Sequence, residues 1–107
     1  MDSRCLTMPI RLTMRQLQMI RALEQTGSVS EAALGLQVSQ SALSHRIREA
    51  ERLLGTDLYL RQNKRLIATN AGQRVEHAAR IILAELEHTE QHIAQLSSGI
   101  TNNVRLG

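Results

Sequence analysis

The 107-residue sequence contains no phenylalanine or tryptophan, one tyrosine, one proline and one cysteine. A hydrophobic core must therefore be built from Leu, Ile, Val, Met and Ala side chains. The lone Cys5 can form no internal disulfide and cannot build a cysteine-based zinc site alone. Hydrophobic residues still make up 42% of the chain, which is typical of folded proteins and too high for a disordered one. The composition predicts a small aliphatic domain.

Long apolar runs are also absent from the sequence. A membrane-spanning helix needs about 20 predominantly apolar residues in succession, and the longest runs here last only a few residues. Residues 1–12 include Asp2 and other polar residues and lack the apolar centre of a signal peptide. We therefore expect residues 1–12 to be a flexible tail, and the protein to be cytoplasmic with no membrane partner.

Lysine is nearly missing, because 12 of the 13 basic residues are arginine and only Lys64 is lysine. Arginine is the better residue for recognising phosphates and base edges. Residues 39–65 hold six basic and three acidic residues, whereas residues 70–97 hold two basic and four acidic ones. This uneven distribution indicates two regions with different roles. The alternative is that both simply contain solvated helix faces.

Capping signals predict two helices near the start of the chain. Thr13 and Gln16 have the spacing of a capping box, which predicts a first helix over about residues 14–26. Ser28 or Ser30 can cap a second, short helix. Small apolar residues on this second helix would allow another helix to approach closely.

A third helix is predicted over residues 40–54, with Ser39 as its N-cap and Gly55 at its end. Leu43, Ile47 and Leu54 fall on one stripe of this helix. At about 100° per residue the polar side chains gather on roughly the opposite side. These polar residues are Gln40, Ser41, Ser44, His45, Arg48 and Arg52.

The next segment has the pattern of a small β-hairpin. Leu58–Arg61 and Leu66–Thr69 are short strand-like runs, and the polar, basic residues 62–65 lie between them. The pattern predicts a hairpin with a four-residue loop.

A long helix follows from Thr69 or Asn70, and we expect it to end at Ser97–Gly99 with Ile100 beyond it. Apolar residues alternate at spacings of four and three, a heptad pattern weakened only by Thr89. The expected dimerisation residues are Val75, Ala79, Ile82, Leu86, Ile93 and Leu96. So small a chain has nothing large enough to cover such a helix, so the pattern predicts pairing with a second copy.

Two short helices joined by a tight turn, with a polar and basic second helix and a hairpin after it, describe a winged helix-turn-helix. The major groove of DNA presents a distinct donor and acceptor pattern for each base pair. Gln40 can pair with adenine, Arg48 with guanine, and Ser41 and Ser44 with bases or phosphates. Two alternatives remain open: a generic amphipathic helix with an arginine-rich surface, and a helical homodimerisation module without DNA binding.

These segments resemble the LysR-type transcriptional regulators over about residues 14–97. The resemblance rests on residues 27–33, Leu36, residues 38–44, Ile47, Glu51, residues 54–55, residues 58–61 and residues 68–72. It implies a mainly α fold, with a winged helix-turn-helix over residues 13–69 and a dimerising linker helix over residues 70–98. It also implies a bacterial transcription factor.

The resemblance further implies a recognition helix over residues 39–54 in the major groove and a wing over residues 61–65 on the minor groove or the backbone. His45 stands where the family often has arginine. Together with Arg48, the expected DNA-binding residues are Ser39, Gln40, Ser41, Ser44, His45, Arg61, Asn63, Lys64 and Arg65.

The partners that the resemblance implies are promoter DNA, as an imperfect inverted repeat, and a second copy of the chain, with a tetramer possible in the full-length protein. Val104–Gly107 is similar to the opening strand of the family's effector domain. We therefore expect residues 99–107 to be a hinge and the start of a missing domain that senses a small effector. A naturally short protein is the alternative.

No cofactor, metal or catalytic activity is expected. His88 and His92 lie four residues apart and could share a metal ion, but no third ligand is evident. No nucleophile–base pair or glycine-rich phosphate loop stands out.

Overall fold

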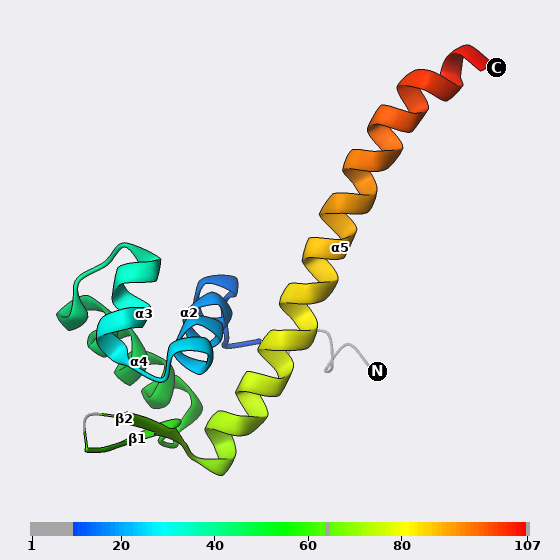
Figure 1. Cartoon of the computed structure of the whole chain (residues 1–107). Helices are drawn as coiled ribbons and strands as arrows, with labels where there is room; N and C mark the ends of the chain where they lie inside the picture. Colours follow the sequence, from blue (N-terminus) through cyan, green and yellow to red (C-terminus); the bar gives the residue numbers. More distant parts are fainter. Residues whose placement is uncertain (1–9, 64, 107) are drawn as a thin grey trace, which may run out of the picture.

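The structure is a computed structural model that describes residues 10–63 and 65–106, with side chains described as far as residue 98. The helix-turn-helix elements and the hairpin gather at one end of the molecule, and a long helix projects away from them (Figure 1). The elements in chain order are α2 (Met14–Thr26), α3 (Val29–Leu36), α4 (Gln40–Leu54), β1 (Tyr59–Gln62), β2 (Arg65–Ala68) and α5 (Asn70–Leu106). The predicted fold class, a mainly α winged helix-turn-helix followed by a long helix, is confirmed.

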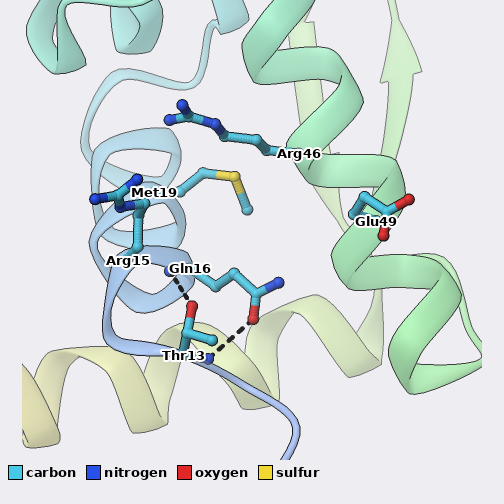
Figure 2. A pocket seen from close by; sticks show the side chains of 6 residues that line it. All are labelled: Thr13, Arg15, Gln16, Met19, Arg46 and Glu49. Carbon is cyan, nitrogen blue, oxygen red and sulfur yellow. Dashed lines mark hydrogen bonds between the residues drawn. The ribbon is translucent and has the colours of Figure 1, made fainter.

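The first two helices begin at side chains that satisfy free backbone amides. The Thr13 hydroxyl accepts a hydrogen bond from the Gln16 backbone amide at 3.1 Å, and the Gln16 side chain accepts one from the Thr13 amide at 2.9 Å (Figure 2). The predicted capping box is therefore confirmed. For α3, the Ser28 hydroxyl accepts from the Glu31 amide at 3.3 Å, so Ser28 rather than Ser30 is the N-cap.

The start of α4 and the ends of α2 and α4 follow the same local rules. The Ser39 hydroxyl accepts a hydrogen bond from the Ala42 amide at 3.1 Å, which confirms Ser39 as the N-cap. Gly27 ends α2 and Gly55 ends α4, with φ values of 67° and 75°. Glycine adopts this left-handed conformation without the steric cost that other residues meet.

The core lies between α2, α3, α4, the start of the hairpin and the first turns of α5. Ile20, Leu23, Leu43 and Leu58 are its largest fully buried side chains. The buried Ala32 gives α3 a small inward face, as the sequence predicted. Because the core is aliphatic, its stability depends on close packing rather than on a few large aromatic rings.

The hairpin has a shorter loop than predicted. The two strands pair in antiparallel register as far as Gln62 and Arg65, so only positions 63 and 64 separate them. The expected four-residue loop over 62–65 is therefore wrong. Asn63 adopts a left-handed φ of 50°, which asparagine tolerates well and which permits a tighter turn. Gln62 and Arg65 are both exposed, so their polar side chains do not oppose pairing.

Helix α5 begins at a tight junction with the hairpin. The Thr69 hydroxyl donates to the Asp57 carbonyl oxygen at 2.7 Å and accepts from the Gly72 amide at 3.0 Å. The Thr69 amide donates to the Leu58 carbonyl oxygen at 2.9 Å. A Cβ atom at Gly72 would overlap this Leu58 carbonyl oxygen and lie 3.3 Å from the Ala68 Cβ. Glycine therefore lets α5 start directly against β1.

Helix α5 continues through Leu106, so the predicted end at Ser97–Gly99 is wrong. The expectations that Ile100 lies beyond the helix and that a strand opens at Val104 are wrong for the same reason. Serine and glycine lower helix stability by up to about 1 kcal/mol each, but neither removes a backbone donor as proline does. Residue 107 lies outside the described residues.

The heptad pattern of α5 divides into a covered part and an exposed part. Ala79 is 0% exposed, and Val75 and Leu83 are partly buried against the protomer's own core. The prediction that Ala79 lies on a dimer surface is therefore wrong, and Val75 packs largely within the protomer. The reason is that α2 packs along the first turns of α5. The exposed members of the pattern are Ile82, Leu86, Ile93 and Leu96, which are 38–57% exposed.

Candidate nucleic-acid interface

Helix α4 separates a buried apolar side from an exposed polar side. Leu43, Ile47 and Ala50 are buried in the core. Ser44 is half-buried at the edge of the polar side. The exposed members of this recognition face are Ser39, Gln40, Ser41, His45 and Arg48. The structure thus brings together on one helix all the site residues that the sequence predicted for residues 39–48.

The wing lies directly beside this recognition face. The Arg61 guanidinium, on β1, donates a hydrogen bond from Nη2 to the Ser44 hydroxyl at 3.0 Å. Ser44, Arg48 and Arg61 also line a shallow hollow of about 200 Å³, together with Glu51 and other residues. Arg61 therefore connects β1 to α4 and makes the two elements one continuous surface.

A second hollow, of about 260 Å³, continues this surface toward the start of α3. Gln40, Arg61 and Arg65 line it together with Ser28 and Ser30. The sequence identified the two serines only as possible helix caps and missed them as neighbours of Gln40. The two serine hydroxyls at the start of α3 were the feature of the sequence that could have indicated this part of the surface. Its position beside α4 and the wing depends on the tertiary fold, which no local pattern reveals.

The acidic residue that lines the first hollow, Glu51, is engaged elsewhere. The Glu51 carboxylate accepts hydrogen bonds from the Leu58 and Tyr59 amides, at 2.8 and 3.2 Å, and so holds the start of β1. In the part of the chain whose side chains are described, Arg48, Arg61 and Arg65 form no ion pair with an acid. The surface therefore keeps its positive charge.

Arg52 was predicted on the polar side of α4, but it pairs along the helix with Glu49. Arg52 Nη2 lies 2.7 Å from Glu49 Oε1. This hydrogen bond lowers the pKa of Glu49 and raises the pKa of Arg52. Both side chains are well exposed, so the pair contributes little to stability. Arg52 therefore adds no unpaired positive charge beside the recognition face.

The remaining predicted wing residues are Asn63, Lys64 and Arg65. Asn63 and Arg65 are exposed, whereas Lys64 lies outside the described residues. Leu60 and Ile67 are cross-strand partners on one face of the hairpin, and both are exposed. The tip therefore offers polar and basic groups with apolar side chains just behind them.

A hollow on another side of α4 is not continuous with this surface. Thr13, Arg15, Met19, Arg46 and Glu49 line it, together with Gln16 (Figure 2). At 100° per residue, Arg46 lies roughly opposite the middle of the recognition face. The exposed Arg15 and the half-buried Arg46 are thus arginines outside the candidate interface.

The described part of the chain also bears on metal sites and membrane spans. Within the described side chains, no three His, Cys, Asp or Glu residues are grouped so that they could hold a metal ion. No described helix is long and apolar enough to cross a membrane.

Residues 14–73 match the family described as "Bacterial regulatory helix-turn-helix protein, lysR family". The chain belongs to the LysR family. The HTH-type transcriptional regulator MetR of Haemophilus influenzae is 35% identical over 98 residues, which cover 92% of this chain and 32% of that protein. The chain therefore spans about a third of this LysR-family relative's length.

Solved LysR-family DNA-binding domains have the same fold. A CbnR DNA-binding domain in complex with DNA is 29% identical, with a TM-score of 0.68 over 81% of this chain and 99% of that one. A BenM DNA-binding domain in complex with benA site 1 DNA is 25% identical, with a TM-score of 0.75 over 82% and 99%. The resemblance stated from the sequence is confirmed. The relatives are named as transcriptional regulators, not as enzymes.

Proposed function

We propose that this chain binds double-stranded promoter DNA sequence-specifically, as the DNA-binding part of a transcription regulator in the bacterial cytoplasm. The observation that carries the proposal is the continuous positive surface formed by the recognition face of α4 and Arg61 and Arg65 of the wing. The chain's likeness to DNA-binding domains solved with bound DNA supports the same conclusion.

The residues of α4 have distinct roles in this proposal. The exposed Gln40 amide offers one donor and one acceptor, the pair that adenine matches in the major groove, and Arg48 matches guanine. Ser39 and Ser41 lie at the helix N-terminus, where the helix dipole favours a phosphate. His45 presents an imidazole ring in place of the rigid five-donor fork of an arginine, so it distinguishes bases less sharply than an arginine would.

Arg61 can hold Ser44 and a phosphate at the same time. A guanidinium carries five N–H donors in a rigid fork, and the bond to Ser44 uses one of them. The remaining donors can contact the DNA backbone beside the groove that α4 enters. Asn63 and Arg65 at the wing tip then approach the minor groove or the backbone, as would Lys64, which lies between them in the sequence.

We further propose that two copies pair through α5. The exposed heptad members Ile82, Leu86, Ile93 and Leu96 form an apolar stripe. Met14 of α2 is exposed and lines a surface hollow of about 350 Å³ with Leu86 and neighbouring residues of α5. A symmetric dimer presents two α4 helices and so reads an inverted repeat. A tetramer and a small-molecule effector would depend on the remainder of a longer protein.

Binding of labelled duplex, followed by fluorescence anisotropy at several salt concentrations, tests the proposal. If each protomer neutralises three or four phosphates, log K should fall with log salt at a slope of roughly −5 to −7. Arg61→Ala should flatten the slope by about 2 per dimer. Arg15→Ala removes the same charge outside the interface and should leave the slope unchanged.

The outcomes separate the two candidate functions. A dimer that binds no duplex in low salt would contradict DNA binding and favour a helical homodimerisation module. A slope that Arg61→Ala and Arg15→Ala change equally would show that Arg61 makes no phosphate contact.

A further inference from the structure

The winged helix-turn-helix over residues 13–69 forms the winged head of the molecule. Three residues of α5 contact this winged head at intervals of four residues. Gly72 lies against the Leu58 carbonyl, Glu76 follows one turn later, and Arg80 follows one turn after that. Residues four apart lie on the same side of a helix. This side of α5 therefore meets the head at successive points along about 12 Å of helix.

The contact in the middle is a hydrogen bond between the wing and α5. The residue Tyr59 is 8% exposed, and its hydroxyl donates to Glu76 Oε2 at 3.0 Å. Burial raises the pKa of Tyr59, so the hydroxyl stays protonated and remains a donor at neutral pH. Burial also raises the pKa of Glu76, although the bond from Tyr59 opposes that shift.

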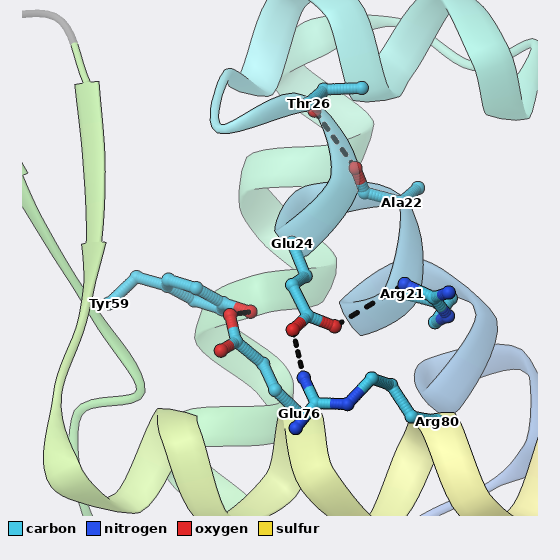
Figure 3. A network of polar contacts seen from close by, with 7 residues as sticks. All are labelled: Arg21, Ala22, Glu24, Thr26, Tyr59, Glu76 and Arg80. Carbon is cyan, nitrogen blue, oxygen red and sulfur yellow. Dashed lines mark hydrogen bonds and ion pairs between the residues drawn. The ribbon is translucent and has the colours of Figure 1, made fainter.

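The third contact joins α5 to α2. Arg80 Nη1 forms an ion pair with Glu24 Oε2, and Arg21 lies 3.4 Å from the other carboxylate oxygen of Glu24. Figure 3 shows Tyr59, Glu24 and the two α5 side chains converging from three elements. The sole tyrosine of the chain thus sits where the wing, α2 and α5 meet.

The rest of α5 projects beyond this junction, so a small change of angle at the junction displaces the far end of the helix by a larger distance. Every described residue from 84 to 98 is exposed. That segment spans about 22 Å at 1.5 Å per residue. A tilt of about 10° at the junction would move its far end by about 4 Å, which exceeds the 3.4 Å rise of one base pair.

We propose that Tyr59, Glu76, Glu24 and Arg80 form a clamp that fixes the angle between α5 and the winged head, and so sets the separation of the half-sites that a dimer accepts. They are positioning residues, because none lies on the recognition face. The role in half-site spacing rests on the proposed function above. The fixed angle itself does not, and it can be measured without DNA.

The angle can be measured by double electron–electron resonance between two spin labels. Cys5→Ser removes the native thiol, and Leu34→Cys on α3 and Gln91→Cys on α5 place one label on each side of the clamp at exposed positions. Dilution with unlabelled protein keeps the measurement within one protomer. Tyr59→Phe should widen the distance distribution, because it removes only the hydroxyl.

Two control variants test whether the widened distance distribution depends on the Tyr59–Glu76 hydrogen bond. Glu76→Gln still accepts the Tyr59 hydrogen bond, so its distance distribution should match that of the parent protein. Glu85→Gln makes the same chemical change at an exposed position and should also have no effect. A distribution for Tyr59→Phe as narrow as the parent's would overturn the clamp, whatever the DNA measurements show.

The effect on DNA is measured with inverted repeats whose half-site separation changes one base pair at a time. An off-optimum separation should weaken parent binding about tenfold, because DNA must be deformed to fit. For Tyr59→Phe the loss should fall to about threefold, with unchanged affinity for an isolated half-site. A purely structural role would weaken all separations alike and would overturn the proposal. A parent protein that binds no duplex despite a narrow distribution would overturn the proposed function, and the role in spacing with it.

Discussion

Replacing Gly72 by alanine should destabilise the winged head more than replacing Gly27, Gly35 or Gly55 would. The added methyl group would overlap the Leu58 carbonyl oxygen, which is rigid backbone rather than the end of a flexible side chain. That oxygen also accepts the Thr69 amide at the start of α5. The helix must therefore move away from β1, and the junction hydrogen bond weakens.

Overpacking of a tight site costs about 1–3 kcal/mol, and a weakened hydrogen bond adds about 1 kcal/mol. We therefore expect Gly72→Ala to lower the free energy of unfolding by about 2–4 kcal/mol. For a domain of this size 1 kcal/mol corresponds to about 4–8 °C in Tm, so the variant should melt at least 8 °C or so lower.

Gly35→Ala is the matched control. Gly35 lies within α3, and nothing lies within 4 Å of an added Cβ. Alanine is about 1 kcal/mol better than glycine inside a helix, so this variant should be slightly more stable than the parent. Thermal and urea unfolding, followed by circular dichroism at one fixed protein concentration, make the comparison. Equal stability of Gly72→Ala and Gly35→Ala would refute the steric reasoning.

Three further predictions concern the dimer, base reading and pH. Leu86→Asp should convert the dimer into a folded monomer in sedimentation, because a charge in an apolar seam is costly; a parent protein already monomeric at tens of micromolar contradicts this. Gln40→Ala should lose about 1–3 kcal/mol on a selected site and much less on random duplex; equal losses would make Gln40 a backbone contact. Since burial raises the folded-state pKa of Glu76, the native state binds more protons than the unfolded state between the two pKa values. The stability of the parent relative to Glu76→Gln should therefore be highest below the unfolded pKa and decline as pH rises through the folded one.

The matched pH control is Glu49, whose pKa Arg52 lowers. The stability of the parent relative to Glu49→Gln should be present above the unfolded pKa and decline as pH falls through the folded one. The two difference curves, from urea unfolding at several pH values, should therefore slope in opposite directions. Difference curves that slope in the same direction would contradict the pKa shifts assigned to Glu76 and Glu49.

The local features of the fold were predictable because short-range chemistry determines them. Thr13 and Ser39 cap helices through bonds to amides three residues away, and Gly27 and Gly55 end helices in the left-handed conformation. The polar side of α4 follows from helical periodicity alone. Each of these signals lies within a few residues of the structure that it specifies.

The features that the sequence missed depend on residues far apart along the chain. The heptad pattern identifies an apolar stripe, but only the packing of α2 against α5 decides that Ala79 is buried within the protomer. The Tyr59–Glu76 bond joins residues 17 apart and the Arg80–Glu24 pair joins residues 56 apart. No periodicity or capping rule relates such positions. The clamp could be seen only in three dimensions.

Selection of bound duplexes from a random library, followed by sequencing, tests the central claim most directly. The account predicts enrichment of an imperfect inverted repeat whose two half-sites keep a constant separation, because two α4 helices read it. It also predicts that Gln40→Ala alters the preferred base at one position of each half-site. Recovery of no common sequence, or of a single unrepeated site, would contradict sequence-specific binding by a dimer.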